Sequence, residues 1–242
     1  MFYPHNQWLT IWTFVLKVPL SALACCLVCT IGLAGEDDKR HLLPPVLLLC
    51  ACLVHTPVSF LYHLTMPVGD PVKLALNRAD YALMFVMAVI VSYTLGFYPF
   101  YCNPQFQLVQ MLGCGVASAL NVVWALTPVY RKSHQARLLR VLLSAAVVTL
   151  ALLPVFYTAA TSTGWYAPYY PAAWGLAAWA FFPIGALVWV LHFPEKWIPR
   201  VFDCNMNSHA WMHLCVVVSH LLFYAFNFQG YRAMKAKGFV CE

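Results

Sequence analysis

Seven stretches of about 20 mainly apolar residues follow one another along the chain, and few charged residues interrupt them. A helix needs about this length to cross the hydrocarbon core of a bilayer. In lipid, every backbone polar group must be paired within the protein, so spanning segments are helices or strands of closed barrels, and runs this long indicate helices. The expected spans are residues 8–34, 42–66, 79–98, 106–127, 138–158, 169–192 and 209–228.

The composition points to the same class of protein. Of the 242 residues, 62% are hydrophobic and 9% are charged, and the mean hydropathy is +0.72. Soluble domains carry about 25% charged residues, so this chain has too few to cover a water-facing surface. We predict an all-α membrane protein whose residues 1–242 form a single seven-transmembrane helix bundle. The sequence leaves open which membrane holds it.

The linkers between the runs are short and rich in charged and turn-forming residues, such as GEDDKR at 35–40 and GDP at 69–71. Short links predict antiparallel neighbouring helices. Lys17 interrupts the first run, where merging or splitting would give six or eight spans instead of seven. The first run begins within about ten residues of Met1, so we expect no long extension before it.

The lysines and arginines predict an orientation. Eight lie on the face that holds the N-terminus and the second, fourth and sixth linkers, and five lie on the other face. Cytoplasmic loops carry the excess of these residues, which predicts a cytoplasmic N-terminus and a non-cytoplasmic C-terminus. We expect Lys17 to extend back to the cytoplasmic side. Because the basic residues are scattered among loops, the net charge of +6 does not indicate nucleic-acid binding.

The ten cysteines show no spacing typical of a disulfide framework or of a zinc ribbon. Several lie inside apolar runs, where a thiol acts as a small hydrophobic group. Cys102 and Cys241 both fall on the expected non-cytoplasmic side. A bridge between them is compatible with that placement, and the sequence does not decide it.

Polar residues inside membrane spans are costly, and each is therefore a candidate for function. Ser59 and His63 lie four residues apart at the end of the second run, Asp80 opens the third, and His209 and His213 open the seventh. Histidines at i and i+4 share one helix face and can reach one metal ion. These three ends fall on the same membrane face, so the residues can converge there.

Three imidazoles with an open fourth position form the ligand set of a catalytic zinc ion. We therefore predict that His63, His209 and His213 bind Zn²⁺. Asp80 would hold a water molecule or orient a ligand there, and Ser59 could hydrogen-bond that water or a substrate oxygen. Alternatively, Asp80 pairs with Arg78 or Lys73 and has only a structural role.

A short histidine motif has a high rate of chance matches, and other histidines have simpler interpretations. We expect three of them to be hydrogen-bonded core residues: His55, His192 and His220. Three others are expected at the membrane interface: His5, His41 and His134.

Several motifs, taken in order, resemble one known family. These are TIWT at 10–13, Ser59 with His63, Asp80-Tyr81, FYCNPQ at 100–105, PEKWIPRVFD at 194–203, and SHAWMH at 208–213. The set resembles the progestin and adipoQ receptor family, which includes hemolysin III-like proteins, and FYCNPQ is most similar to its adiponectin-receptor branch. The resemblance covers nearly the whole chain.

This resemblance implies a seven-helix fold with a cytoplasmic N-terminus. It also implies zinc held by the histidines at 63, 209 and 213, with Asp80 bound through a water molecule. Two positions depart from the family pattern: Phe14 stands where a histidine is common, and Arg200 stands where a glycine often follows the proline. Alkaline ceramidases have a similar layout, but their opening acidic motif is missing here.

Three functions are compatible with these features. The first is a zinc-dependent, receptor-type amidase acting on a membrane lipid such as ceramide and releasing a fatty acid, with Asp80 as general base and then acid and Ser59 stabilising the oxyanion. The second is a non-catalytic receptor with a structural zinc ion and an extracellular protein or steroid ligand. The third, a hemolysin-like pore, is disfavoured because the charged groups within the spans gather at one end.

Overall fold

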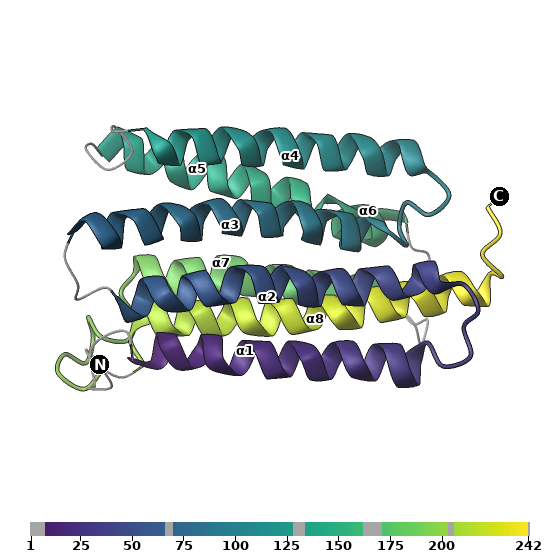
Figure 1. Ribbon diagram of the computed structural model, residues 1–242, viewed down its shortest axis with the longest axis horizontal. Coiled ribbons are helices and arrows are strands. Elements are labelled where there is room, and N and C mark those ends of the chain that lie inside the picture. The colour runs from purple at the N-terminus through teal and green to yellow at the C-terminus, as the bar shows by residue number, and fades with distance from the viewer. Residues whose placement is uncertain (1–7, 66–69, 128–133, 162–170, 203–205, 242) are drawn as a thin grey trace.

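Long helices lie side by side along one direction in the computed structural model (Figure 1). It describes residues 8–65, 70–127, 134–161, 171–202 and 206–241. The helices are α1 (Trp8–Leu27), α2 (Leu43–Leu64), α3 (Asp70–Gly96), α4 (Pro104–Leu126), α5 (His134–Ala151), α6 (Leu153–Thr161), α7 (Pro171–Val190) and α8 (Ser208–Ala236). A π-helical turn, η1 (Val28–Gly32), extends α1, and a 3-10 turn, η2 (Lys39–Leu42), precedes α2.

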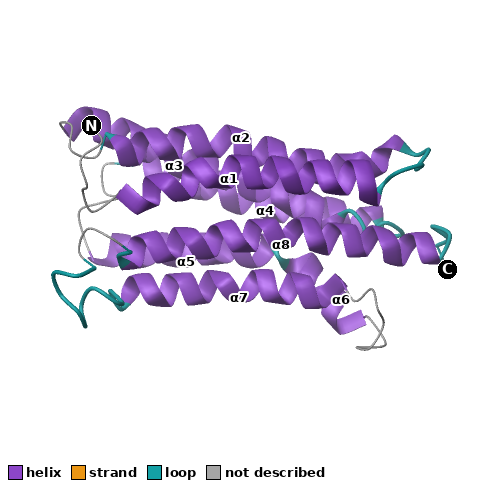
Figure 2. Cartoon of the chain, turned by 90° about the horizontal axis from the view of Figure 1, so that it is seen from below, coloured by secondary structure: helices purple, strands orange, loops and turns teal. Residues whose placement is uncertain are grey.

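Six helices in the described part of the chain are long and apolar enough to cross a membrane. A seventh span results if α5 and α6 are counted together, since they meet at a bend of 47°. Pro154 accounts for the bend, because it has no N–H to continue the helical hydrogen bonds and its ring clashes with the preceding turn. Figure 2 shows α6 turning away from the direction of the bundle. The expected all-α membrane fold is confirmed.

Two helix ends differ from the expected runs. The third expected run starts at residue 79, whereas α3 already begins at Asp70. Pro71 follows directly, and proline is favoured at the first position of a helix, where its missing N–H costs nothing. The sequence GDP, which indicates a turn, thus also starts a helix. At the other end, α8 continues to Ala236, eight residues past the expected 228.

The closest helix pair is α7 with α8, and α8 also packs against α1. Small residues on α7 allow this approach: a Cβ added at Gly175 would meet the Phe226 ring at 2.8 Å, and one at Gly185 would meet Cys215 at 3.1 Å. In membranes, small residues let helix backbones come close. The Ser219 hydroxyl donates to the Ala178 carbonyl oxygen across this contact, at 2.8 Å.

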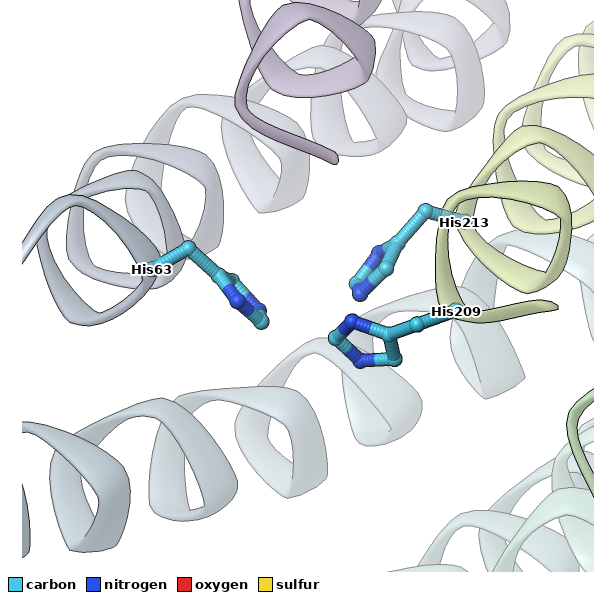
Figure 3. A group of neighbouring side chains, drawn as sticks. All are labelled: His63, His209 and His213. Atoms are coloured by element: carbon cyan, nitrogen blue, oxygen red, sulfur yellow. The ribbon is translucent and has the colours of Figure 1, made fainter. Parts of the chain in front are cut away.

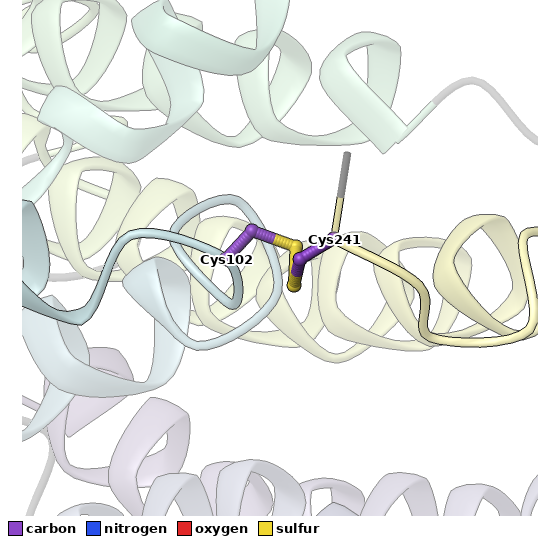
Figure 4. The surroundings of a disulfide bond; sticks show 2 residues. All are labelled: Cys102 and Cys241. Atoms are coloured by element: carbon purple, nitrogen blue, oxygen red, sulfur yellow. A yellow bond between two sulfur atoms is a disulfide. The ribbon is translucent and has the colours of Figure 1, made fainter.

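The two ends of the bundle differ in chemistry. At one end α2 finishes and α8 begins, and at the other end lie the link from η1 to η2 and the residues after α8 (Figure 1). That second end holds a disulfide between Cys102, which follows α3, and Cys241, which follows α8 (Figure 4). The bridge left open by the sequence is therefore present in the structure.

Lys17 differs from its prediction. Its side chain is 2% exposed and lies inside the bundle rather than extending to the surface. Its α-carbon is more than two helical turns past the start of α1 at Trp8, and the packing of α1 against α2 and α8 encloses the side chain there. The buried Lys17 side chain interacts electrostatically with Cys52 of α2 and Asp80 of α3.

Candidate metal centre

The three predicted metal histidines come together between α2 and α8, with their imidazoles directed toward a common centre (Figure 3). One ring nitrogen of each lies within 4.8 Å of the others. The ring centroids of His63 and His209 are 5.0 Å apart, and those of His209 and His213 are 4.7 Å apart. His63 lies in the last turn of α2, and His209 and His213 occupy successive turns at the start of α8.

The donors fit a zinc ion. Two nitrogens bound to the same zinc at about 2.0–2.1 Å can be no more than about 4.2 Å apart, so small rotations of the rings bring this set within binding distance. Nε2 of His213 is buried and has no hydrogen-bond partner within the described part of the chain, which suits a nitrogen that binds a metal. Three protein ligands also leave a fourth position open.

Phe14 forms one wall of the centre. Its ring is 3% exposed, stacks on His63 with centroids 5.4 Å apart, and meets His213 edge-on at 4.8 Å. The position where the family commonly has a histidine thus holds an apolar ring in contact with two of the three imidazoles. The sequence pattern identified the departure but not this contact.

Asp80 lies near the histidines but is not one of the converging group. Its Oδ1 is 3.2 Å from Nε2 of His55, and both side chains are largely buried. The predicted alternative partners, Arg78 and Lys73, form no ion pair with Asp80 in the described part of the chain. The carboxylate still acts electrostatically on His63 and His209. Sequence reasoning missed His55, which lies two turns before His63 on α2.

Ser59 is buried at 1% exposure, one turn before His63 on the same helix. A serine at this position can present its hydroxyl on the face of α2 that carries His63. It is therefore near the three-histidine centre along the helix, as the spacing predicts.

Glu195 positions the start of α8. Its carboxylate accepts a hydrogen bond from the Ser208 backbone N–H at 2.7 Å and another from the Ser208 hydroxyl. Burial raises the pKa of Glu195, but the hydrogen bonds from Ser208 outweigh it and hold the pKa below its usual value. The Asn207 side chain also caps the helix by accepting from the Ala210 N–H. The first turn of α8, which carries His209, is thus held from the preceding loop.

The other histidines differ in part from their predictions. His192 is not a core residue, since its side chain is 67% exposed. Its Nδ1 lies 3.7 Å from Oε1 of Glu195 in the turn that follows α7. His41 lies in η2 and is 2% exposed, because aromatic rings of the turn after α3, of α8 and of the chain after α8 surround it. His220 is buried as expected, yet neither ring nitrogen has a hydrogen-bond partner among the described residues. His5 and the side chain of His134 lie outside the described residues.

Comparisons with known proteins give the chain its family. The sequence is 28% identical over 147 residues to Heptahelical transmembrane protein ADIPOR3 of Oryza sativa subsp. japonica, covering 58% of this chain and 34% of that protein. It is 28% identical over 172 residues to Heptahelical transmembrane protein 3 of Arabidopsis thaliana, covering 70% and 48%. The Adiponectin receptor protein of Drosophila melanogaster is 22% identical over 173 residues, covering 69% and 37%.

The aligned region thus spans about a third to a half of the length of these relatives. The heptahelical names of the two plant relatives agree with seven spans, with α5 and α6 counted as one. The profile of the family described as Haemolysin-III related matches residues 2–224. This match confirms the resemblance drawn from the motifs, and the chain belongs to the Haemolysin-III related family of multi-pass membrane proteins.

Proposed function

We propose that this protein is a zinc-dependent hydrolase of lipid amides with a ceramide-like substrate. The observation that carries the proposal is the convergence of His63, His209 and His213, whose ligand atoms lie within 4.8 Å of one another inside a membrane bundle. Three protein nitrogens with one open position are typical of catalytic rather than structural zinc. The donor set therefore favours an enzyme.

Zinc bound there would polarise the amide carbonyl and lower the pKa of a water molecule. Asp80 would accept the proton of that water and pass it to the leaving amine, first as a general base and then as a general acid. His55, 3.2 Å from the Asp80 carboxylate, would orient it. The Ser59 hydroxyl would stabilise the oxyanion that forms on the carbonyl oxygen.

The surroundings of the centre suit a lipid substrate. Large apolar side chains are exposed along the outer faces of the helices, for example Leu16 and Leu20 on α1 and Leu61 on α2. In a bilayer these faces contact acyl chains, so a ceramide could approach the histidines sideways between helices. The released fatty acid would leave by the same route.

The disulfide supports the predicted orientation. Disulfides persist in oxidising compartments and are rare in the cytosol. We therefore infer that the end with Cys102 and Cys241 faces away from the cytoplasm, and that the three-histidine end faces the cytoplasm. The excess of lysine and arginine on the histidine side leads to the same orientation.

A second candidate is a receptor in which zinc is structural. Asp80 favours this alternative, because it faces His55 instead of joining the three histidines. The name of the Drosophila relative, an adiponectin receptor protein, is consistent with an extracellular ligand. In this case a protein or steroid ligand would act through helix movement without chemistry.

Zinc content and ceramide turnover, measured on the same detergent-purified samples, distinguish these candidates. We expect about one zinc per chain in the wild type and its loss in His213→Ala. His220→Gln, which removes a buried histidine two turns further along α8, is the matched control and should retain zinc. The absence of zinc from a well-folded wild type would contradict both candidates.

Turnover then tests the role of Asp80. We expect Asp80→Asn to retain zinc but to release sphingoid base at least about 100-fold more slowly, because the general base is lost. Undiminished turnover in this variant would exclude the role given to Asp80. Zinc-loaded wild type that releases no sphingoid base from any ceramide would favour the receptor.

A further inference from the structure

A line of buried polar side chains runs between α1 and α8, away from the three histidines. We call this line the polar seam, and its members are Lys17, Ser21, His220, Tyr224, Asn227 and Tyr231. Each is at most 2% exposed. The predicted metal ligands are not members of the seam.

The spacing of the seam places its members on single helix faces. On α8 they follow at intervals of four, three and four residues from His220 to Tyr231, and on α1 Lys17 and Ser21 are four residues apart. These intervals put residues on one side of a helix. α1 packs against α8, and Lys17 interacts with His220 and Ser21 with Tyr224, so the two polar faces adjoin.

Part of the seam lacks hydrogen-bond partners. Both ring nitrogens of His220 and Oδ1 of Asn227 are buried and unpartnered in the described part of the chain. The hydroxyls of Ser21 and Tyr224 interact with each other between α1 and α8. A buried polar atom without a partner costs about 1–3 kcal/mol. Internal water molecules normally satisfy such groups. The three unpartnered atoms therefore mark positions that suit internal water molecules along the seam.

Ionisable groups surround the inner part of the seam. His213, His220 and Asp80 act electrostatically on the Lys17 ammonium, as does Cys52 from α2. His55 acts on His220 from the same side. The seam therefore approaches the three-histidine end without including the ligands.

The opposite end of the seam reaches the surface. The Tyr231 hydroxyl hydrogen-bonds the Glu36 carboxylate, and the Lys235 ammonium donates to both, at 2.8 Å and 3.3 Å. Glu36 lies in the link between η1 and η2, and the Lys235 side chain is 54% exposed. The polar seam thus extends from the interior of the bundle, near the three histidines, to the disulfide end.

We propose that the polar seam carries protons from one side of the membrane to the other. Imidazole, phenol, amide and hydroxyl groups each donate and accept hydrogen bonds, and with water between them they can pass a proton along. His220 would take a proton on one ring nitrogen and release the proton from the other, so its net charge is restored after each transfer. Ionisable residues within membrane spans commonly mark such relays.

The same residues disfavour other ions. The members of the seam form no ring of carbonyl or carboxylate groups that could replace the water shells of sodium or potassium. Charged groups that gather at one end of the spans disfavour an ion pore. A proton path needs hydrogen-bonding groups along its length instead of fixed charges. The proposal is independent of zinc and of hydrolysis.

Proton flux into vesicles tests the proposal. The full chain is reconstituted in phosphatidylcholine vesicles that contain a pH-sensitive dye, and a potassium gradient with valinomycin drives protons inward. We expect the lumen of wild-type vesicles to acidify several-fold faster than that of protein-free vesicles. A wild-type rate equal to that of protein-free vesicles would overturn the proposal.

Variants locate the path. His220→Phe and Tyr224→Phe should reduce the flux toward the protein-free rate, and the second removes only one hydroxyl, so its fold is easily retained. Ser219→Ala, beside His220 but bonded to Ala178 of α7, is the matched control and should conduct like the wild type. Thermal unfolding and zinc content show that each variant is folded. Undiminished flux in both folded variants would overturn the proposal, whereas loss of flux with zinc retained separates it from the proposed hydrolase.

Discussion

At the scale of single residues, Phe14 shows how an apolar side chain can form the wall of a candidate metal centre. Its ring lies against both His63 and His213 and is 3% exposed. It limits how far the two imidazoles can rotate and keeps that side of the centre free of water. An apolar wall also strengthens electrostatic interactions within a site, because the local dielectric constant is low.

Replacing Phe14 tests this role. We expect Phe14→Ala to lower the free energy of unfolding by about 3–5 kcal/mol, as for other buried phenylalanines, and to speed zinc release because the rings lose their wall. Phe14→Leu, which keeps most of the volume, should retain zinc much better. Thermal unfolding in detergent and zinc release to a chelator measure the two effects. Equal zinc release from all three proteins would contradict the role.

The sequence identified the three histidines because their signal is local. His209 and His213 are four residues apart on one helix, and His63 ends a neighbouring span on the same membrane face. The partner of Asp80 could not be found in this way. The contact with His55 depends on how far α2 and α3 are shifted along each other, and spacing within one helix carries no information on that shift. The burial of Lys17 likewise depends on packing between helices.

At the scale of elements, the start of α8 is held by the loop before it. Glu195 accepts two hydrogen bonds from Ser208, directly before His209. The first N–H groups of a helix have no partner within it, so the loop supplies one. The position of two predicted metal ligands therefore depends on an acidic residue thirteen positions away from Ser208.

We expect Glu195→Gln to weaken this arrangement. The amide has one acceptor oxygen and no charge, so at least one of the two hydrogen bonds to the carboxylate is lost, at a cost of about 1.5–3 kcal/mol. Zinc should dissociate faster because the first turn of α8 opens more often. Lys196→Gln, in the exposed neighbouring position, is the control. Zinc release that is unchanged in Glu195→Gln would show that Asn207 alone holds the turn.

A second link between elements depends on pH. The hydrogen bond from Tyr231 holds the pKa of Glu36 below its ordinary value of 4.5, with burial opposing and Lys235 assisting. A lowered pKa in the folded state means that Glu36 stabilises the fold fully above about pH 4.5 and loses that contribution as the pH falls through the lowered value.

Comparing melting temperatures in detergent at pH 7 and at pH 3.5 tests this link. At pH 7 the wild type should melt at a higher temperature than Glu36→Gln, and the gap should narrow at pH 3.5. Asp37→Asn, at the exposed neighbouring position, should show no such narrowing. A gap that stays constant between the two pH values would mean that the Glu36 charge does not stabilise the fold.

Helix number and type could be predicted from the sequence because apolar length determines them. The bend at α5 and α6 was missed, since residues 138–158 form one continuous apolar run and hydropathy does not register Pro154. The early start of α3 was missed for a related reason: GDP reads as a turn, yet proline also suits the first position of a helix.

At the scale of the whole molecule, the bundle has two chemically different ends. The three histidines lie where α2 ends and α8 begins. The disulfide, the link from η1 to η2 and the chain after α8 lie at the other end of the bundle (Figures 1 and 4). The disulfide joins residues 139 positions apart, so it fixes the end of α8 to the α3–α4 turn across most of the sequence. The three-histidine end and the disulfide end therefore define one axis along the length of the bundle.

This axis makes the membrane orientation testable. Under the proposed orientation the disulfide end faces an oxidising compartment. We therefore expect Cys102 and Cys241 to resist membrane-impermeant maleimide in intact cells and to react with it after an impermeant reductant opens the bridge. The measurement is labelling of the wild type against a Cys102→Ser, Cys241→Ser double variant, which should gain no label. Removing the bridge should also lower the free energy of unfolding by about 2–4 kcal/mol, since the unfolded chain is no longer constrained. Labelling of these cysteines only after the cells are permeabilised would place either the disulfide end on the inner side or the protein in an internal membrane. Repeating the experiment on sealed organelle vesicles of known orientation separates these two cases. Labelling from the cytoplasmic face alone would reverse the proposed orientation and place the three histidines away from the cytoplasm.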